Sequence, residues 1–348
     1  MNIGLIGAGN ISQTHGRAAA AIPGVSVVAV HGANPAKTRE LAAAHGAAAY
    51  DQLDAFLAHE PMDVVIIGSP SGVHAAQGIA AARRRRHVLV EKPIDVTTER
   101  ADALIAAVEE CGVRLAVLFQ DRLKPGIVRL KQLVDSGGLG RVLSVSARVP
   151  WYRPPDYYRQ SRWRGTAALD GGGALMNQGV HTVDLLLWVL GDVTRVQART
   201  ATLFHEIESE DTALALLEFA SGATGVLEAS TATYPGYPRR VEITGTEGTV
   251  ILQHDRIVAA DLRTPRPELL ADGGGDANAS ASSPVVSDAS GHQRLIEDFL
   301  RAIETGARPA CDGHEGRRSV ELVEAIYRSA RSLASEPVGN RAERRRTR

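Results

Sequence analysis

A chain of 348 residues is longer than a single hydrophobic core usually supports, which predicts two domains. The formal net charge of -1 provides no overall field that would attract nucleic acid or an acidic membrane surface, and two cysteines are too few for a disulfide framework. No apolar run approaches the roughly 18 residues of a membrane span, and a buried strand is expected from residue 2, where a signal peptide would begin. We therefore expect a soluble, cytoplasmic protein with no nucleic-acid or membrane partner.

The first third of the sequence alternates short apolar runs with alanine-rich helical patterns. The runs consist mainly of Val, Ile and Leu without regular polar alternation, which is typical of parallel strands buried on both faces. They cover residues 3–6, 25–30, 64–67, 87–90 and 115–118, and the helical patterns cover 38–45, 74–84 and 98–110. This βαβ series predicts a doubly wound, dinucleotide-binding Rossmann domain over residues 1–121, of the α/β class.

Beyond residue 121 the apolar pattern changes to a period of two. Apolar and polar side chains alternate over 142–149, and further strand-like runs lie at 212–219, 224–230, 240–244 and 248–252. Gly222 separates the run at 212–219 from that at 224–230, and the turn at 245–248 separates the last two runs, which predicts antiparallel hairpins. Helices are expected at 177–190, 292–304 and 316–334, and a long loop at 265–290. We expect an α+β second domain over residues 122–338, with a large open, mainly antiparallel sheet, and a basic tail at 339–348.

A glycine turn follows the first apolar run. Residues 3–14 read IGLIGAGNISQT, a strand, then Gly7-Ala-Gly9, then a helix beginning near Asn10 and Ile11. Gly7 permits the tight turn, Gly9 lets the backbone approach a pyrophosphate, and the helix N-terminus supplies N–H groups. Ser12 stands at the third glycine position of this pattern and is small enough for close helix packing. The turn predicts dinucleotide binding; the alternative is a tight structural turn.

The end of the second run bears on the choice of cofactor. An acidic residue usually binds the ribose of NAD there, but residues 31–37 read HGANPAK and contain no acid. A 2′-phosphate would therefore meet no repulsion. Lys37 would reach such a phosphate unless it is only a solvated helix residue, and Asn34 would bond either cofactor. We expect NAD or NADP, with a lean towards NADP.

A lysine follows the fourth apolar run, in Val90-Glu91-Lys92-Pro93. Ligands of such folds bind at the carboxyl ends of the strands, which would put Lys92 beside the nicotinamide. A partly desolvated lysine near a positively charged ring exchanges its proton more readily and can act as acid or base. The alternative is an exposed loop lysine.

A second polar stripe lies in the other half, where residues 171–184 read GGGALMNQGVHTVD. On a helix, Asn177, His181 and Asp184 share one face, and the glycines would let the backbone lie close to a ligand. His181 is a candidate base, whereas Asn177 can only orient a substrate. Asp184 either fixes the tautomer of His181 or is a helix-surface carboxylate. One imidazole and one carboxylate make a poor metal set, so we expect no metal.

Together these motifs resemble the glucose-fructose oxidoreductase / inositol dehydrogenase (Gfo/Idh/MocA) family. The resemblance rests on Gly7-x-Gly9, Ser69-Pro-Ser-Gly-Val-His74, His87-Val-Leu-Val-Glu-Lys-Pro93 and Gly171-Gly-Gly to His181-x-x-Asp184. It implies that Lys92 and His181 act in catalysis with Asn177 beside them. It also implies cofactor contacts from Ser69, Pro70, His74, Glu91 and Lys92. The family commonly has Asp where this chain has Asn177, and members with Asn there resemble enzymes of nucleotide-sugar or other sugar substrates.

Aromatic and arginine residues gather between residues 151 and 164, although only 4% of the chain is aromatic. Rings against a sugar face and arginines towards hydroxyls or a phosphate would suit carbohydrate recognition; the alternative is a structural loop over the sheet. For Arg122 the alternative is a domain-linking salt bridge. The expected substrate-binding residues are Arg122, Tyr152, Arg153, Trp163, Arg164, Asn177, His181 and Tyr237.

The predicted function is that of an NAD(P)-dependent oxidoreductase that interconverts a secondary alcohol and a ketone on a sugar, nucleotide sugar or polyol. Lys92 and His181 would handle the proton. One alternative is a non-enzymatic nucleotide-sensing regulator on the same fold, and another is a hydrolase or epimerase that retains its cofactor. An exposed sheet face in the second domain favours a homodimer or homotetramer.

Overall fold

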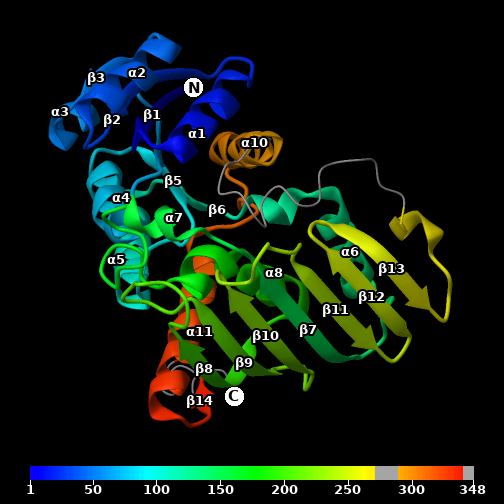
Figure 1. Cartoon of the computed structure of the whole chain (residues 1–348). Helices are drawn as coiled ribbons and strands as arrows, with labels where there is room; N and C mark the ends of the chain where they lie inside the picture. The colour runs from blue at the N-terminus through cyan, green and yellow to red at the C-terminus, as the bar shows by residue number, and fades with distance from the viewer. Residues whose placement is uncertain (271–288, 340–348) are drawn as a thin grey trace. The chain divides into compact units, whose positions relative to one another are not determined.

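The chain divides into two compact units (Figure 1). The structure, a computed structural model, describes residues 1–270 and 289–339. Unit 1 comprises Met1–Gln120 and Val285–Arg317, and unit 2 comprises Asp121–Pro284 and Arg318–Arg348. The sequence predicted a continuous second domain, whereas in the structure the helix near residue 300 belongs to unit 1. Most of the predicted loop at 265–290, and all but the first residue of the predicted tail, lie outside the described residues.

Unit 1 is built on a parallel six-stranded sheet with the order β3-β2-β1-β4-β5-β6, which confirms the predicted Rossmann fold. Its strands are β1 (Asn2–Ile6), β2 (Ser26–His31), β3 (Ala48–Tyr50), β4 (Val64–Ile67), β5 (His87–Glu91) and β6 (Leu115–Leu118). All four residues of β4 and of β6 are buried, as expected for strands covered on both faces.

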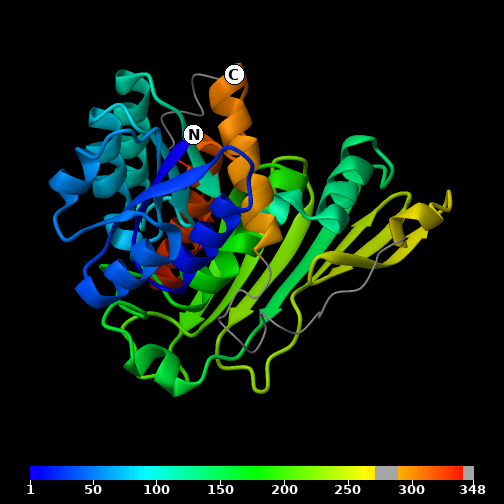
Figure 2. The same cartoon turned by 90° about the horizontal axis from the view of Figure 1, so that it is seen from above.

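Helices cover both faces of this sheet (Figure 2). They are α1 (Asn10–Ala20), α2 (Pro35–His45), α3 (Leu53–Leu57), η1 (Ser71–Val73), α4 (His74–Arg83), α5 (Thr98–Cys111), α10 (Ser290–Thr305) and the start of α11 (Gly313–Ser332). The helix α10 packs beside α1, although about 270 residues separate them in the chain. Its buried stripe of Leu295, Ile296, Phe299 and Leu300 explains why it belongs to this core.

Parallel strands place their carboxyl ends at one edge of the sheet. The loops after β1, β2, β4 and β5 therefore share one edge. The residues that the sequence assigned to the cofactor lie in these loops, at the end of β5 or in the first turns of the helices that follow. The strand order reverses between β1 and β4, which is where open α/β sheets bind their ligands.

Unit 2 contains an eight-stranded sheet with the order β13-β12-β11-β7-β10-β9-β8-β14, and its pairings are antiparallel except for β7 with β10. The predicted open, mainly antiparallel sheet is confirmed. Its strands are β7 (Val142–Pro150), β8 (Val193–Ala201), β9 (Thr212–Phe219), β10 (Thr224–Ser230), β11 (Arg240–Gly245), β12 (Gly248–Gln253), β13 (Arg256–Leu262) and β14 (Glu336–Pro337).

One face of this sheet packs against helices and the other is open. Along β9, alternate residues are buried and exposed, and Leu214 and Leu216 on the open face are about half exposed. The helical elements of this unit are η2 (Gln120–Leu123), which begins at the unit boundary, α6 (Pro125–Asp135), α7 (Pro155–Arg159), η3 (Ala174–Gly179), α8 (Val180–Leu190), η4 (Pro267–Leu270) and the rest of α11. The segment η3 packs against β9 and β10. A search of the described helices finds none with the length and apolarity needed to cross a membrane.

Candidate active site

The glycine turn after β1 leaves room for a ligand. Gly7 has φ +105, and its N–H donates to the carbonyl oxygen of His31 at 2.7 Å. A Cβ on Gly7 would lie 2.6 Å from the oxygen of Gly68, so only glycine fits there. A Cβ on Gly9 would meet nothing within 4 Å. The turn is therefore closed on its inner side and open at Gly9.

The N-terminus of α1, which follows this turn, suits an anion. Gly9 provides no side-chain cap, and the first turn, with Asn10 and Ile11, contains no acidic residue. The N–H groups and the positive end of the helix dipole thus meet no protein carboxylate. Ser12 is buried and lies against the backbone of Gly7 and Gly68, which fits the close helix packing expected of it. These residues fit a pyrophosphate.

At the end of β2, Asn34 has a structural role that the sequence analysis did not assign. Its Oδ1 accepts the N–H groups of Ala36 and Lys37, both at 3.1 Å, and thereby caps α2. The side chain of Lys37 is exposed in the first turn of this helix. An exposed cation beside the end of β2 suits a 2′-phosphate, whereas the Oδ1 of Asn34 is engaged in the cap.

The turn bearing Lys92 is fixed by the carboxylate of Glu91. Its Oε2 accepts the backbone N–H of Lys92 at 3.0 Å, and its Oε1 lies 2.9 Å from Nε2 of His15 and 3.8 Å from Nε2 of His292. Burial alone would raise the pKa of Glu91. The hydrogen bond from His15 and the charges of His15, His292 and Lys92 outweigh this effect and lower the pKa to about 2. Glu91 is thus an ionised anchor of the lysine turn.

The same three residues form a cluster with the spacing of metal ligands: their ligand atoms lie within 4.8 Å of one another, and all three are buried. His15, Glu91 and His292 belong to unit 1, so this is not the stripe that the sequence analysis considered for a metal. Because Glu91 already binds His15 through one oxygen and the Lys92 N–H through the other, hydrogen bonding accounts for the arrangement.

The loop after β4 carries Ser69 and Pro70, and α4 begins at His74. The hydroxyl of Ser69 donates to Oε1 of Gln77 at 2.6 Å, and Pro70 precedes the short turn η1. The His74 side chain, which the motif assigned to the cofactor, is 1% exposed, and both of its ring nitrogens face backbone carbonyl oxygens. A buried ring so engaged holds the protein backbone.

In unit 2, the stripe of Asn177 and His181 spans a change of helix type. Residues Ala174–Gly179 form a π-helix, and α8 begins at Val180. The sequence predicted one α-helix from Asn177, so the four-residue spacing does not act as an α-helical turn there. The wider turn results from a local insertion in the helix ladder, a feature often found at functional sites.

The glycines before this segment serve close packing. A Cβ on Gly172 would lie 2.1 Å from the Tyr327 hydroxyl, and one on Gly173 would lie 2.0 Å from the carbonyl oxygen of Glu210. The Glu210 carboxylate accepts the N–H groups of Gly173 at 3.1 Å and Leu175 at 2.7 Å, and the Tyr327 hydroxyl at 2.9 Å. Burial raises the pKa of Glu210. These contacts explain why Gly172 and Gly173 are needed.

The amide of Asn177 belongs to a hydrogen-bond network. Its Nδ2 donates to Oδ1 of Asp170, and its Oδ1 accepts from Nε2 of Gln178 at 2.8 Å. The amide of Gln178 also donates to the Tyr157 hydroxyl at 3.0 Å and accepts from Nη2 of Arg153 at 2.8 Å. The orientation of Asn177 is therefore fixed by its neighbours. The sequence analysis missed Asp170, Gln178 and Tyr157, although Tyr157 lies in the aromatic window it noted.

Two guanidinium groups stack on aromatic rings beside this network. Arg153, 2% exposed, lies 5.1 Å from the Trp151 ring centre and 5.7 Å from that of Tyr157. Arg164 lies 4.2 Å from the Tyr157 ring and 5.2 Å from that of Trp163. Burial lowers the pKa of Arg153, and the positive charge of Arg164 lowers it further. Predicted substrate residues Arg153, Trp163 and Arg164 are thus brought together in one cationic, aromatic cluster.

Tyr152 and Tyr237 are two further predicted substrate residues of unit 2. The Tyr152 ring packs edge-on against Tyr234 at 5.2 Å and near Phe204 at 6.3 Å. Tyr237 is 53% exposed. No described contact links Tyr237 to the cationic, aromatic cluster.

Arg122 and Asp184 form a buried ion pair. The Nε of Arg122 donates to Oδ2 of Asp184 at 2.9 Å, and its Nη2 donates to Oδ1 at 2.6 Å. The ion pair is buried within unit 2, and Asp184 is therefore not a surface carboxylate. The alternative of a salt bridge was correct for Arg122, although the bridge lies inside one unit.

Asp121 is a charged neighbour of His181 that the sequence analysis missed. Its carboxylate lies 2.9 Å from Nζ of Lys124 and 2.7 Å from Nη1 of Arg239. Burial raises the pKa of Asp121, but the charges of Lys124, Arg239 and His181 hold it well below its usual range. Asp121 immediately precedes the Arg122 that the sequence analysis singled out, and no local pattern marks it as functional.

The fold and the glycine turn define the class of Rossmann oxidoreductases that bind a nicotinamide dinucleotide, and comparison with known sequences supports this class. The model of the oxidoreductase family with an NAD-binding Rossmann fold matches residues 1–119, and the model of the GFO/IDH/MocA C-terminal domain matches residues 127–251. The chain belongs to the Gfo/Idh/MocA family of oxidoreductases, as its motifs predicted.

Relatives match over most of the chain. Inositol 2-dehydrogenase of Rhizobium meliloti (strain 1021) is 28% identical and covers 94% of this chain and 96% of its own length. D-xylose 1-dehydrogenase (NADP(+)) 2 of Haloferax volcanii is 32% identical over 82% of this chain and 84% of its own. The crystal structure of the WlbA dehydrogenase from Bordetella pertussis, in complex with NADH and UDP-GlcNAcA, has a TM-score of 0.89, 35% identity and 98% coverage of both chains.

These relatives support a coarse function. The protein is an NAD(P)-dependent sugar or polyol dehydrogenase, and its substrate is a carbohydrate. The relatives named above are dehydrogenases, which favours the enzyme over the nucleotide-sensing alternative.

Proposed function

We propose that the protein oxidises a secondary hydroxyl of a nucleotide sugar that carries a carboxylate, of the kind that UDP-GlcNAcA represents. The Bordetella pertussis dehydrogenase that holds this compound is 35% identical to the chain over 98% of its length. Asn177 also favours a nucleotide sugar. The family commonly has Asp at this position, and members with Asn there resemble enzymes of nucleotide-sugar or other sugar substrates.

The cationic, aromatic cluster of unit 2 is the observation that carries this proposal. Arg153 and Arg164 flank one tyrosine ring, and the Nε of Arg164 is buried with no hydrogen-bond partner among the described residues. A planar guanidinium binds carboxylate and phosphate oxygens through paired hydrogen bonds. A uridine-diphosphate sugar acid presents both kinds of anion, whereas inositol and xylose present neither. The cluster therefore favours an anionic substrate.

The proton is handled by Lys92 of unit 1 and His181 of unit 2. Nicotinamide, when bound, accepts the hydride that leaves the substrate carbon. His181 accepts the hydroxyl proton as the base, and the nearby carboxylate of Asp121 stabilises the positive charge that the ring then gains. Asn177, oriented by Asp170 and Gln178, positions the substrate by hydrogen bonding. Lys92, held through its backbone by Glu91, donates to the reacting oxygen.

NAD(H) is the proposed cofactor, in place of the lean towards NADP that the sequence suggested. The support is the NADH in the Bordetella pertussis structure. The Haloferax volcanii relative is named for NADP(+), so NADP is retained as the alternative cofactor. Exposed Lys37 is proposed to add affinity for the 2′-phosphate, so that NADPH also binds.

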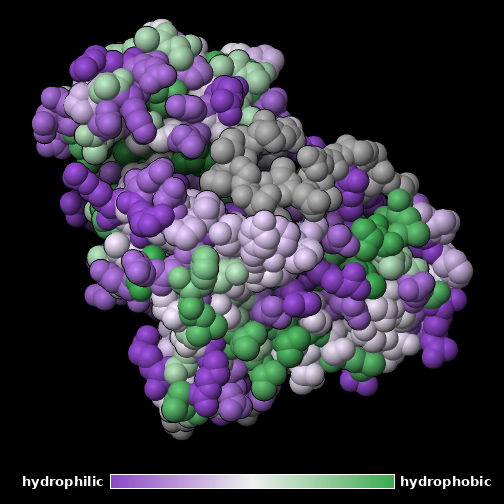
Figure 3. Space-filling view, viewed as in Figure 1, coloured by the Kyte–Doolittle hydropathy of each residue, from purple (hydrophilic) through white to green (hydrophobic). Residues whose placement is uncertain are grey.

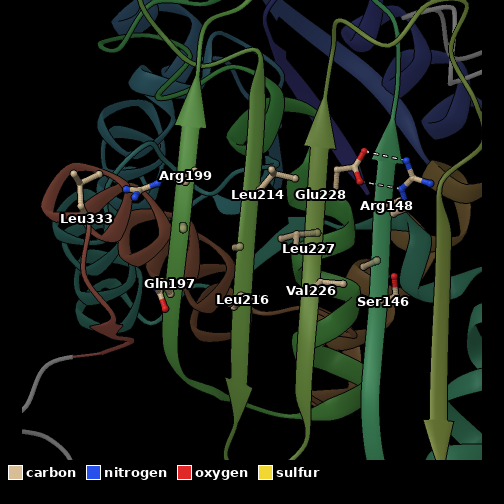
Figure 4. Close-up of a pocket in the computed structure, with 13 residues that line it drawn as sticks. Ser146, Arg148, Gln197, Arg199, Leu214, Leu216, Val226, Leu227, Glu228 and Leu333 are labelled. Carbon is tan, nitrogen blue, oxygen red and sulfur yellow. Dashed lines mark hydrogen bonds and ion pairs between the residues drawn. The ribbon is translucent and has the colours of Figure 1, made fainter.

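A second copy of this chain is the proposed partner, docking on the open face of the eight-stranded sheet. Figure 4 shows Leu214 and Leu216 on β9 and Val226 on β10 lining a hollow, next to the ion pair of Arg148 and Glu228. The space-filling view of Figure 3 shows apolar groups on this part of the molecule among hydrophilic ones. Self-complementary pairing of such a face, with opposite charges at its border, suits a two-fold homodimer.

Sedimentation velocity tests this partner. The wild type should sediment as a dimer or tetramer, and Leu216→Glu should give monomers, since it puts a charge in the centre of the face. A monomeric wild type would remove this part of the proposal. The hollow contains none of the residues predicted to bind cofactor or substrate, so the Leu216→Glu monomer should still bind NADH.

The substrate is tested by mixing the protein with NAD+ or NADP+ and UDP-GlcNAcA, and recording absorbance at the nicotinamide band. UDP-GlcNAc, which lacks the carboxylate, is the matched control, with myo-inositol and D-xylose as neutral sugars. NADH formation selective for UDP-GlcNAcA, and a raised KM in Arg164→Ala, support the proposal. Preferential turnover of the neutral compounds would refute the anionic substrate. A converted substrate without net NADH would indicate a retained cofactor instead.

A further inference from the structure

His74 joins two loops at the carboxyl edge of the unit 1 sheet. It is the first residue of α4 and is 1% exposed. Its Nδ1 lies 2.9 Å from the carbonyl oxygen of Pro93, the residue after Lys92, and its Nε2 lies 2.9 Å from the carbonyl oxygen of Ser69. One buried ring thus spans the loop after β4 and the lysine turn after β5.

The chemistry of these contacts fixes which atoms donate. A carbonyl oxygen can only accept, so each contact needs a hydrogen on the ring nitrogen. A hydrogen on Nδ1 binds the oxygen of Pro93, and a hydrogen on Nε2 binds that of Ser69. Both bonds form only when both nitrogens carry hydrogens. The two nitrogens therefore have separable tasks, and the Nδ1 hydrogen serves the lysine turn.

The lysine turn has a second anchor on its other side. The N–H of Lys92 donates to Oε2 of Glu91, whose other oxygen binds His15 on α1. The backbone is therefore held on the N-terminal side of Lys92 by Glu91 and on its C-terminal side, at Pro93, by His74. The start of α4 is fixed in turn by Asp95, whose Oδ2 accepts the N–H of Ala75 at 2.8 Å.

We propose that His74 is a positioning residue for Lys92, acting through its Nδ1 hydrogen bond to the Pro93 carbonyl. The bond sets the direction in which the Lys92 side chain leaves the backbone, while the Nε2 bond ties the turn to the Ser69 loop. The inference rests on the proposed role of Lys92 in proton handling.

Two substitutions separate the two tasks. The amide nitrogen of asparagine lies two bonds from Cβ, as Nδ1 of histidine does. The amide nitrogen of glutamine lies three bonds from Cβ, as Nε2 of histidine does. His74→Asn keeps the donor to Pro93, His74→Gln keeps the donor to Ser69, and His74→Phe removes both. His87→Asn is the control: it removes a histidine of unit 1 from the N-terminal end of β5, at the opposite end of that strand from the lysine turn.

The measurement is kcat with NAD+ and UDP-GlcNAcA, together with the Kd for NADH and the thermal midpoint of each variant. His74→Gln and His74→Phe should lower kcat by roughly 10- to 100-fold, since small misplacements of a reacting group have effects of that size. His74→Asn and His87→Asn should keep kcat within a few-fold, and NADH affinity should change little in all four. Equal kcat in the Asn and Gln variants, or losses that follow the thermal midpoint, would overturn the inference.

Lys92→Ala distinguishes this inference from the proposed function. If Lys92→Ala lowers kcat but His74→Gln does not, only the positioning role fails. If Lys92→Ala turns over at the wild-type rate, the proton role fails and the positioning role fails with it. Nitrogen NMR of the histidine-labelled wild type adds a test that does not depend on a variant folding. A hydrogen on Nδ1 of His74 supports the inference, and a ring protonated only at Nε2 contradicts it.

Discussion

The guanidinium group of Arg122 and the carboxylate of Asp184 form a buried, two-pronged ion pair, with N–O distances of 2.9 and 2.6 Å. Each side chain is 2% exposed. Asp184 lies one turn after His181 on α8, and Arg122 immediately follows Asp121, whose charge acts on the His181 ring. The pair therefore fixes the two elements of unit 2 that bring Asp121 near His181.

Removing one partner of this pair should destabilise the protein strongly. Asp184→Asn leaves the Arg122 charge buried without its counter-ion, and we expect a loss of about 3 to 5 kcal/mol in the free energy of unfolding. Urea unfolding measures this loss. The control is Asp192→Asn, which breaks the largely exposed pair with Arg318 and should cost less than about 1 kcal/mol. Equal losses in the two variants would show that the buried pair has no special role.

The two glycines of the dinucleotide turn should respond differently to alanine. Gly7→Ala forces a side chain into a left-handed conformation against the Gly68 carbonyl, and we expect a loss of about 1 to 3 kcal/mol in stability. Gly9→Ala meets no protein atom and should change stability by less than about 1 kcal/mol. Its methyl group would occupy the open side of the turn, so the Kd for NADH should rise roughly ten-fold, or about 1.4 kcal/mol.

Fluorescence titration with NADH and thermal unfolding of both variants check this prediction. NADH affinity unchanged in Gly9→Ala would contradict the placement of the pyrophosphate at this turn. A Gly7→Ala protein as stable as the wild type would contradict the strain assigned to Gly7.

The sequence was sufficient for the architecture because its apolar periods differ between the halves. Uninterrupted Val, Ile and Leu runs predicted the parallel sheet, and alternation predicted the open one. The short elements β3 and α3 gave too few residues for a period. Neither the parallel pairing of β7 with β10 nor the return of α10 to unit 1 is encoded in local patterns, since both depend on contacts between segments far apart in the chain.

Candidate side chains were harder to interpret than strands. Arg122 and Asp184 are polar residues next to motifs, and only the folded chain shows that they pair across 62 positions. A π-helix uses the same residues as an α-helix, so the spacing of Asn177 and His181 predicted an α-helix where part of the segment is a π-helix. His74 was assigned to the cofactor from its motif, but its burial and its two carbonyl partners depend on tertiary structure.

Lys37 should distinguish the two nicotinamide cofactors. Removing its charge in Lys37→Ala should weaken NADPH roughly ten-fold or more, as expected for a lost charged hydrogen bond, and change NADH less than about two-fold. Titration of the variant with both cofactors measures this difference. Arg39→Ala, an exposed cation on the same helix, is the matched control. Equal effects of Lys37→Ala on NADH and NADPH would exclude a role at the 2′-phosphate.

The depressed pKa of Glu91 predicts a pH-dependent contribution to stability. Because the folded-state pKa is about 2 against 4.5 for the free group, the ionised carboxylate stabilises the fold above pH 4.5, and this stabilisation is lost as pH falls towards 2. At neutral pH it amounts to roughly 3 kcal/mol. The stability difference between wild type and Glu91→Gln should therefore shrink between pH 4.5 and 2.

Urea unfolding at a series of pH values follows this difference. Glu109→Gln, which removes an exposed carboxylate of the same unit, is the control and should show little change with pH. A difference between wild type and Glu91→Gln that stays constant down to pH 2 would contradict the ionised anchor beneath the lysine turn.

The most direct test of the account is the single-turnover rate of NADH formation by Lys92→Ala, with UDP-GlcNAcA and saturating NAD+. Loss of a positioned proton donor or acceptor should slow this rate by roughly 100-fold or more, while the Kd for NADH stays within several-fold of the wild type. His181→Ala should behave in the same way. A Lys92→Ala enzyme that forms NADH at the wild-type rate would remove Lys92 from the chemistry and contradict the account.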